Sequence, residues 1–280
     1  MTSGRRAGQW QTFPAETLRR LFDAVDVNDA VDAHAPLPEP IVLACPEDSI
    51  RQCYSLSLQF WKDGVIRADA LRLIDKLLRN EGLSADERLE FKHIRARYKQ
   101  LRFTQRLYSR RHRSDYLFDK TTRMLGKLQD AFRGGQRGDI VRSGFKLRVL
   151  LSKPVWWFVQ RSLENTRLDS EAGLIAFQKA EIRALKEAMA GSTFAGHEFH
   201  TVRKIVSMQV SFYDTQRTLG PNDHAYRMSR FLAAINGLMG SRHDEMIAEA
   251  LSGRRHYDTP APLANETRSR LETLIARYPL

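Results

Sequence analysis

The chain has few cysteines and no long apolar run. Of 280 residues only Cys45 and Cys53 are cysteine, and their spacing is not that of a CxxC redox or zinc motif. We therefore expect a reducing compartment, with neither a disulfide nor a structural zinc site. The most apolar window, residues 149–159, is interrupted by Lys153 and Pro154 and is too short to span a bilayer.

Several signatures of enzymes and of export are also absent. The sequence contains no GxSxG motif and no Walker phosphate-binding loop. Arg5 and Arg6 are not followed by an apolar segment, so the first ten residues do not resemble a secretory signal. We predict a cytoplasmic protein that is not an enzyme and has no cofactor and no metal site.

Positive charge is abundant. The chain carries 45 Lys and Arg against 33 Asp and Glu, a formal net charge of +12, and its pI is about 9.9. A hydrophobic content of 42% with 28% charged residues is typical of a folded globular protein. The charge balance indicates a polyanionic partner, which could be nucleic acid, polyphosphate or an acidic lipid surface.

Positive charge is concentrated in residues 88–113, where ten Lys or Arg stand against the single acid Glu90. Five of these cations follow one another at intervals of 3, 4, 3 and 4 residues: Lys92, Arg95, Lys99, Arg102 and Arg106. On a helix they form one row, and an apolar row lies about 100° away. Like charges at this spacing destabilise an isolated helix by roughly 0.2–0.5 kcal/mol per pair. The row therefore needs either open solvent or an anion opposite it.

Helical periodicity dominates the rest of the chain, and no segment alternates for long enough to demand a sheet. Helices are expected over residues 14–25, 49–61, 68–79, 84–111, 114–132, 139–151, 155–163, 171–189, 197–219, 222–251 and 265–278. Ser84 and Glu87 have the pattern of a capping box, and Ser114 is expected to cap the next helix. The adjacent aromatic residues Trp156, Trp157 and Phe158 are expected in the core. The fold class is all-α.

Two passages of the sequence repeat. Residues 91–95 (FKHIR) match residues 199–203 (FHTVR), and residues 123–129 match residues 230–236, at offsets of 108 and 107. Nearly equal offsets indicate a duplicated helical unit with pseudo-twofold symmetry. We expect an N-terminal helix and linker over 1–46, a first helical half over 47–164 and a second over 165–280.

The repeated segments resemble a known family. Residues 94–103 (IRARYKQLRF), followed by Leu128-Gln129-Asp130, resemble a signature of the CHAD family, the conserved-histidine α-helical domains. Residues 200–204 (HTVRK) are similar to another hallmark of that family, a histidine three residues before an arginine. Residues 235–240 (INGLMG), with His243-Asp244 after them, have the spacing of its LQDxLG segment, although Asn-Gly replaces Gln-Asp.

This resemblance implies a fold and a function. Two four-helix-bundle-like halves, related by internal duplication, would enclose a basic cavity that binds inorganic polyphosphate without catalysis, and polyphosphate granules would be a further partner. Lys92 occupies the place of the signature histidine, and Ser207 and Met208 stand where further basic residues are usual. The first half would therefore dominate binding.

The predicted polyphosphate contacts form three groups. They are Lys92, Arg95, Lys99, Arg102 and Arg106 in the first row, Lys120, Arg123 and Lys127 in a second row, and His200, Arg203 and Lys204 in the second half. The second row either lines the cavity or is ordinary surface. His200 is either a ligand contact or a packed, hydrogen-bonded side chain.

Two other functions use the same residues. A nucleic-acid-binding helical protein would use the same cations, but the chain shows no helix-turn-helix and few aromatics among the basic residues. The pair His243-Asp244 occurs in metal-dependent phosphohydrolases, which need a further carboxylate from a later helix. The remaining aspartate, Asp258, lies in a proline-flanked turn soon after, so this alternative has the least support.

Overall fold

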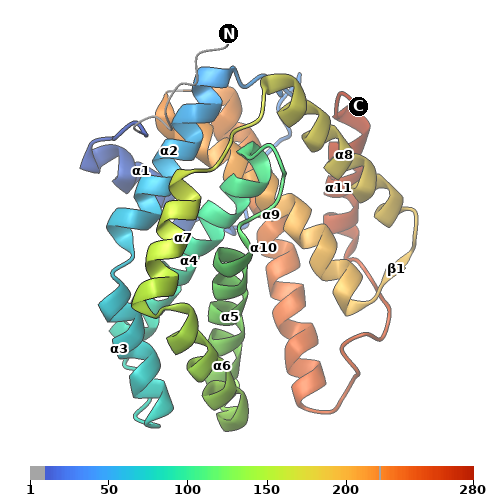
Figure 1. Cartoon of the computed structure of the whole chain (residues 1–280). Coiled ribbons are helices and arrows are strands. Elements are labelled where there is room, and N and C mark those ends of the chain that lie inside the picture. Colours follow the sequence, from blue (N-terminus) through green and yellow to red (C-terminus); the bar gives the residue numbers. More distant parts are fainter. Residues whose placement is uncertain (1–9, 221) are drawn as a thin grey trace. The chain divides into compact units, whose positions relative to one another are not determined.

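The chain folds almost entirely into helices (Figure 1). The structure is a computed structural model that describes residues 10–220 and 222–280. The helices of this part are α1 Ala15–Asp26, α2 Glu47–Gly64, α3 Arg67–Leu78, α4 Ala85–Tyr108, α5 Tyr116–Arg133, α6 Arg137–Leu150, α7 Lys153–Glu164, α8 Glu171–Met189, α9 Gly196–Leu219, α10 Asp223–Leu251 and α11 Asn265–Arg277. Two short antiparallel strands, β1 Thr193–Phe194 and β2 Ala261–Pro262, accompany them. The all-α class is confirmed.

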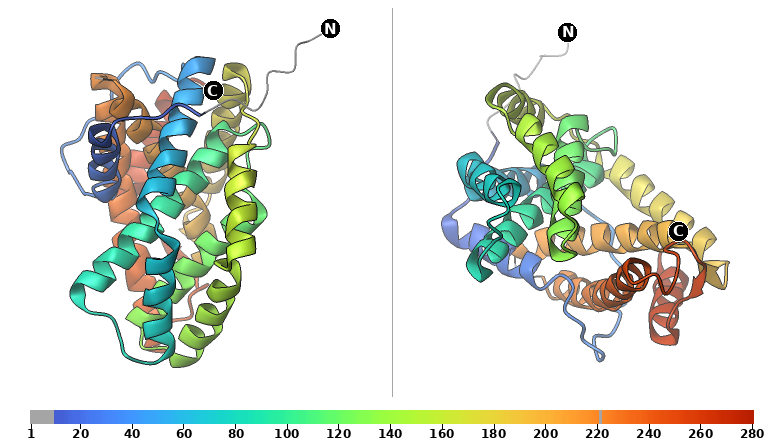
Figure 2. Two further views of the ribbon diagram at one scale, coloured as in Figure 1. Left: turned by 60° about the vertical axis from the view of Figure 1, so that its left-hand side comes forward. Right: turned by 90° about the horizontal axis from the view of Figure 1, so that it is seen from below.

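The chain divides into two compact units. Unit 1 consists of Met1–Leu18 and Asp48–Asp169, and unit 2 consists of Arg19–Glu47 and Ser170–Leu280. In unit 1, α5 packs against α4 and α6, and α6 packs against α3 (Figure 1, Figure 2). In unit 2, α9 packs against α8 and α10. No helix in the described part is long and apolar enough to cross a membrane.

An aromatic cluster forms the core of unit 1. Trp61 of α2 contacts Tyr98 of α4 and Phe118 of α5, with ring centroids 5.7 and 5.5 Å apart, and all three side chains are buried. Tyr98 stacks on Phe118 at 5.0 Å. Large aromatic rings that pack edge to face contribute burial and a defined geometry. The cluster therefore sets which side of α4 faces inward.

The start of α4 is the predicted capping box. Ser84 accepts a hydrogen bond from the backbone N–H of Glu87, and the Glu87 carboxylate accepts one from the N–H of Ser84. Lys76 also donates to Glu87, at 2.8 and 2.9 Å. Hydrogen bonds from Lys76 and from the Ser84 backbone lower the pKa of Glu87 to about 2. The carboxylate thus stays charged at the positive end of the helix dipole.

The expected cap of α5 was wrong by one residue. Asp115, not Ser114, accepts from the N–H groups of Leu117 and Phe118. The Ser114 hydroxyl instead donates to the side chain of Gln105 in α4. Either residue type can cap a helix, so the choice depended on where the turn places each side chain.

The aromatic triplet of α7 is only partly in the core. Trp156 packs on Trp61 at 5.1 Å, whereas Trp157 and Phe158 are 62% and 54% exposed, contrary to expectation. Successive residues on a helix point about 100° apart, so three in a row cannot all face one neighbour. The buried side of α7 is completed by Val159 and Leu163.

The segment expected as a linker is packed in unit 2. Arg230 of α10 donates to the carbonyls of Val27 and Ala30 at 3.2 and 3.4 Å. The side chain of Asn236 donates a hydrogen bond to the carbonyl of Asn28 at 2.9 Å. The next residue, Gly237, has no Cβ, and a Cβ added there would lie only 2.1 Å from the carbonyl oxygen of Asp29. The pair Asn236-Gly237 therefore seats this segment on α10. This contact gives a physical reason for Asn-Gly at this point of α10.

We predict that Gly237→Ala lowers the free energy of unfolding by about 1–3 kcal/mol, because the new methyl group collides with backbone rather than with a movable side chain. The matched control is Gly138→Ala in α6, where nothing lies within 4 Å of the added Cβ. That variant should be neutral or more stable by about 0.5–1 kcal/mol. Urea unfolding of both variants measures the difference, and equal stabilities would contradict the contact.

We also predict that Ser84→Ala lowers the free energy of unfolding by about 1 kcal/mol, because it removes an observed cap of α4. Ser152, at the same position of α7, makes no side-chain cap hydrogen bond. Ser152→Ala should therefore lower the free energy of unfolding by less than half as much in the same urea experiment. A larger loss for Ser152→Ala would refute the assignment of the caps.

Candidate functional site

The predicted cation row of α4 lies beside α5. Lys92 is exposed, and the other four members, Arg95, Lys99, Arg102 and Arg106, are half-buried. Because the apolar row of α4 packs into the aromatic core, a row about 100° away falls at the edge of the helix rather than under it. This edge is where α4 meets the neighbouring helix.

Asp119 joins the two helices through charge. Its carboxylate lies 2.6 Å from Nε of Arg102 on α4 and also pairs with Arg123 on α5. The side chains of Asp119 and Arg102 are only 18% and 17% exposed. A partly buried pair is screened less by water and salt than a surface pair, so removing one partner is costly. Asp119 thus places a cation of the first row next to a cation of the second.

Another member of the row also contacts α5. The Arg95 guanidinium lies against Gly126 of α5, and a Cβ there would be 3.5 Å from two of its nitrogens, which is an ordinary van der Waals contact. Arg95 therefore lies beside the α5 backbone. Two cations of the first row, Arg95 and Arg102, thus contact α5, and Arg102 shares Asp119 with Arg123 of the second row, for which the sequence left open whether it is site or ordinary surface.

Aromatic rings accompany other cations. Lys99 lies 5.7 Å from the ring centroid of Phe103, and Lys120 lies 5.4 Å from that of Tyr116. The ring face attracts a cation while leaving its charge available. Lys120 and Lys127 are exposed on α5.

Arg97 differs from the row. It lies over the ring of Phe60, 5.1 Å from its centroid, and fills the space beside Gly64, where a Cβ would overlap it. Burial lowers the pKa of its guanidinium. Arg97 thus contributes to packing, which agrees with its absence from the predicted row.

The predicted residues of unit 2 face α10. Arg203 of α9 lies against Gly240, where a Cβ would be 2.9 Å from one guanidinium nitrogen. The ring of His200 stacks on that of His243 at 5.5 Å, and His243 Nε2 lies 3.2 Å from the Tyr257 hydroxyl. His200 is therefore part of a packed ring cluster, and Lys204 beside it is half-buried.

The pair His243-Asp244 does not extend into a larger group. Nδ1 of His243 is 3.8 Å from the Asp244 carboxylate. Asp258, the remaining candidate carboxylate, lies 3.3 Å from Nδ1 of His197 instead. Within residues 10–220 and 222–280 no three His, Cys, Asp or Glu side chains are grouped so that they could hold a metal ion.

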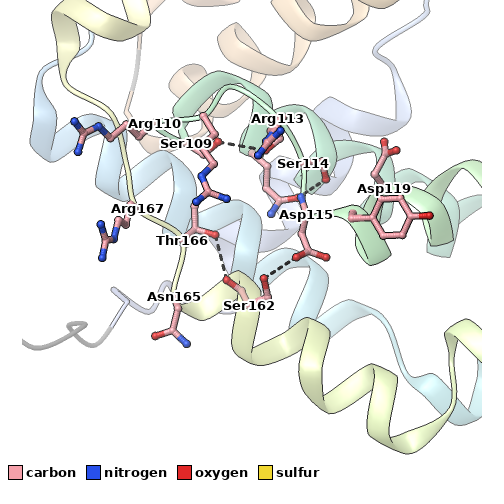
Figure 3. A pocket seen from close by; sticks show the side chains of 13 residues that line it. Ser109, Arg110, Arg113, Ser114, Asp115, Asp119, Ser162, Asn165, Thr166 and Arg167 are labelled. Atoms are coloured by element: carbon pink, nitrogen blue, oxygen red, sulfur yellow. Dashed lines mark hydrogen bonds between the residues drawn. The ribbon is translucent and has the colours of Figure 1, made fainter.

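One feature of unit 1 was missed by the sequence analysis. A pocket of about 1000 Å³ opens where the turn between α4 and α5 meets the segment after α7 (Figure 3). Four arginines line it: Arg110, Arg111, Arg113 and Arg167. The first three belong to the basic stretch of residues 88–113, but nothing in the sequence links them to Arg167.

We predict that Asp119→Asn lowers the free energy of unfolding by about 1–3 kcal/mol, because Arg102 and Arg123 then lose the carboxylate between them. The control is Asp139→Asn, which removes an exposed 3.5 Å pair with Arg142 on α6. That loss should stay below about 0.5 kcal/mol. Urea unfolding measures both variants, and equal losses would show that Asp119 is an ordinary surface acid.

Comparisons with known proteins found no match. No protein-family model matches the chain, no curated protein matches it, and no solved structure matches it. The likeness to the CHAD family is therefore a resemblance carried by short motifs, and the function is argued from the residues and their geometry.

Proposed function

We propose that this protein binds inorganic polyphosphate, without catalysis, through the cations of α4 and α5. The observation that carries the proposal is the meeting of the two predicted rows. Five cations of α4 lie along one edge of the helix, and Asp119 and Gly126 bring α5 against that edge. Basic groups from two helices thus share one face of unit 1.

The row has the form that a linear polyanion requires. From Lys92 to Arg106 it spans 14 residues, which is about 21 Å of helix. A phosphate polymer carries charge at regular intervals, so a series of cations along a rod can contact several phosphates in turn. Arginine donates two parallel hydrogen bonds to such oxyanions, and lysine adds a compact charge.

Unit 2 offers a parallel to this arrangement. The helices α4 and α9 are both 24 residues long, and each presents an arginine against a glycine of the following helix. The pairs are Arg95 with Gly126 and Arg203 with Gly240. The two arginines are 108 residues apart, which is the offset of the repeat, whereas the two glycines are 114 apart. The helix lengths and the arginines therefore support the proposed duplication, and the glycines do not. By its resemblance to the CHAD family, the proposal extends to a basic cavity to which both halves contribute, in a cytoplasmic protein associated with polyphosphate granules.

Single-stranded nucleic acid is the alternative ligand, and one observation favours it. Tyr116, at the start of α5, is 66% exposed and lies beside Lys120. An exposed ring next to a cation is the arrangement on which a base stacks while its phosphate is neutralised. Tyr116 is a single platform next to the second row, whereas the two rows offer a series of charges, so polyphosphate is the better match.

We predict that long-chain polyphosphate binds with an affinity that falls steeply with salt. In the variant Lys99→Gln with Lys127→Gln, the affinity should fall by about tenfold, because two phosphate contacts are lost, and the slope of log affinity against log salt should fall by about 1.4. Binding isotherms at two or more salt concentrations measure both quantities.

The control removes the same charge elsewhere in unit 1. Lys146 and Lys153 are exposed on α6 and α7. Lys146→Gln with Lys153→Gln should leave the affinity within about twofold. An equal loss in the two variants would mean that only net charge matters. Competition of polyphosphate against single-stranded and duplex DNA at matched salt then separates the two ligand classes.

A further inference from the structure

The arginine-lined pocket of unit 1 lies at the end of α4, away from the Arg95–Gly126 contact. Its walls come from the last turn of α4, the turn of residues 109–115, the first turn of α5, the end of α7 and the segment that follows α7 (Figure 3). Hydroxyl and amide groups line the rest of it, among them Ser109, Ser162 and Asn165. The residues that line the pocket are of polar or charged types, which suits a hydrophilic ligand.

Backbone hydrogen bonds hold the two walls together. The N–H of Arg110 donates to the carbonyl of Arg167 at 2.9 Å, and the N–H of Asp169 donates to the carbonyl of Tyr108 at 2.9 Å. These bonds place Arg110 and Arg167 on neighbouring strands of chain. Their side chains extend on the same side of the pocket (Figure 3).

Side chains lock the same junction. The ring of His112 is held between the Asp169 carboxylate, 2.9 Å from Nε2, and the carbonyl of Arg106, 3.0 Å from Nδ1. The hydroxyl of Tyr54 hydrogen-bonds both the carbonyl of Leu163 and the hydroxyl of Thr166, each at 2.8 Å. The pocket is therefore preorganised, and a ligand would not need to order it.

The carboxylates of the pocket are already engaged. Asp115 caps α5 and accepts a hydrogen bond from the Ser162 hydroxyl at 2.7 Å. Asp119 is paired with Arg102 and Arg123. These two carboxylates stand against four arginines, so the pocket keeps an excess of positive charge.

The four arginines have no such partners. In the part of the chain that the structure describes, no carboxylate pairs with the guanidinium of Arg110, Arg111, Arg113 or Arg167, and none of these groups donates a hydrogen bond. A guanidinium has five N–H donors and no acceptor. Several of them around one polar pocket call for a ligand rich in oxyanion acceptors.

We propose that this pocket is a second anion site, which takes a compact ligand with two or three linked phosphoryl groups. A single phosphate is small compared with a space of about 1000 Å³ and would contact only part of its lining, whereas two or three linked phosphoryl groups can contact more of the arginines at once. Inorganic tripolyphosphate and the triphosphate of a nucleotide share this chemistry. The site goes beyond the proposed binding of long polymers along α4 and α5, and it does not depend on it.

The test measures binding of tripolyphosphate, ATP and inorganic phosphate to the full chain and to three variants. The pocket variant is Arg110→Gln with Arg167→Gln, which leaves the backbone bond between these residues intact. The surface control is Arg133→Gln with Arg183→Gln, at two exposed arginines elsewhere. The third is the Lys99→Gln, Lys127→Gln row variant. Melting curves establish that each variant is folded.

The native chain should bind tripolyphosphate and ATP at least about tenfold more tightly than inorganic phosphate, and the ratio of the first two identifies the source of the triphosphate. The pocket variant should lose about tenfold in tripolyphosphate affinity, the equivalent of two lost charge-assisted contacts. The surface control and the row variant should stay within about twofold.

Three results would overturn the site. They are no measurable tripolyphosphate binding to the native chain, an equal loss in the surface control, or a loss in the row variant with none in the pocket variant. The last result would assign short and long phosphates to the α4 and α5 row alone. If the row variant loses long-chain polyphosphate binding but keeps its tripolyphosphate affinity, the two sites are independent, and each proposal can then be rejected without the other.

Discussion

The rotation of α4 about its own axis is the constraint on which the candidate site depends. Tyr98 is buried against Trp61 and Phe118, so one side of the helix must face the core. The cation row lies about 100° from that side, and this angle carries it to the junction with α5 rather than into the interior or out into bulk water. The packing of apolar groups thus decides where the charges lie.

Two observed interactions stabilise close cations at this junction. Asp119 neutralises part of the charge of Arg102 and Arg123. Aromatic rings accompany Lys99 and Lys120. One carboxylate serves the guanidinium groups of both Arg102 and Arg123, so this group of three side chains keeps a net positive charge. An anionic ligand would relieve the repulsion that remains, so stability and binding are coupled through the same groups.

Glycines mark the places where another group approaches a helix closely. Gly126 and Gly240 each receive an arginine from the preceding long helix, and Gly237 receives the backbone of the segment after α1. At Gly240 and Gly237 an added Cβ would overlap the neighbour, whereas at Gly126 it would make an ordinary contact. Gly237 is the strictest of the three, because its neighbour is a carbonyl oxygen that cannot rotate away.

Local pattern determined the helices, the apolar and charged rows of α4 and the capping box at Ser84, because these depend on residues a few positions apart. It predicted Arg95 and Arg102 in one row and left open whether Arg123, in a second row, belongs to the same site. The tertiary structure decided the cap at Asp115, the exposure of Trp157 and the packing of residues 27–35, where sequence allowed more than one outcome. The tertiary structure alone revealed the arginine pocket. Arg110 and Arg167 meet only because the chain after α4 and the segment after α7 exchange backbone hydrogen bonds. A contact between residues so far apart in the chain leaves no periodic pattern in the sequence.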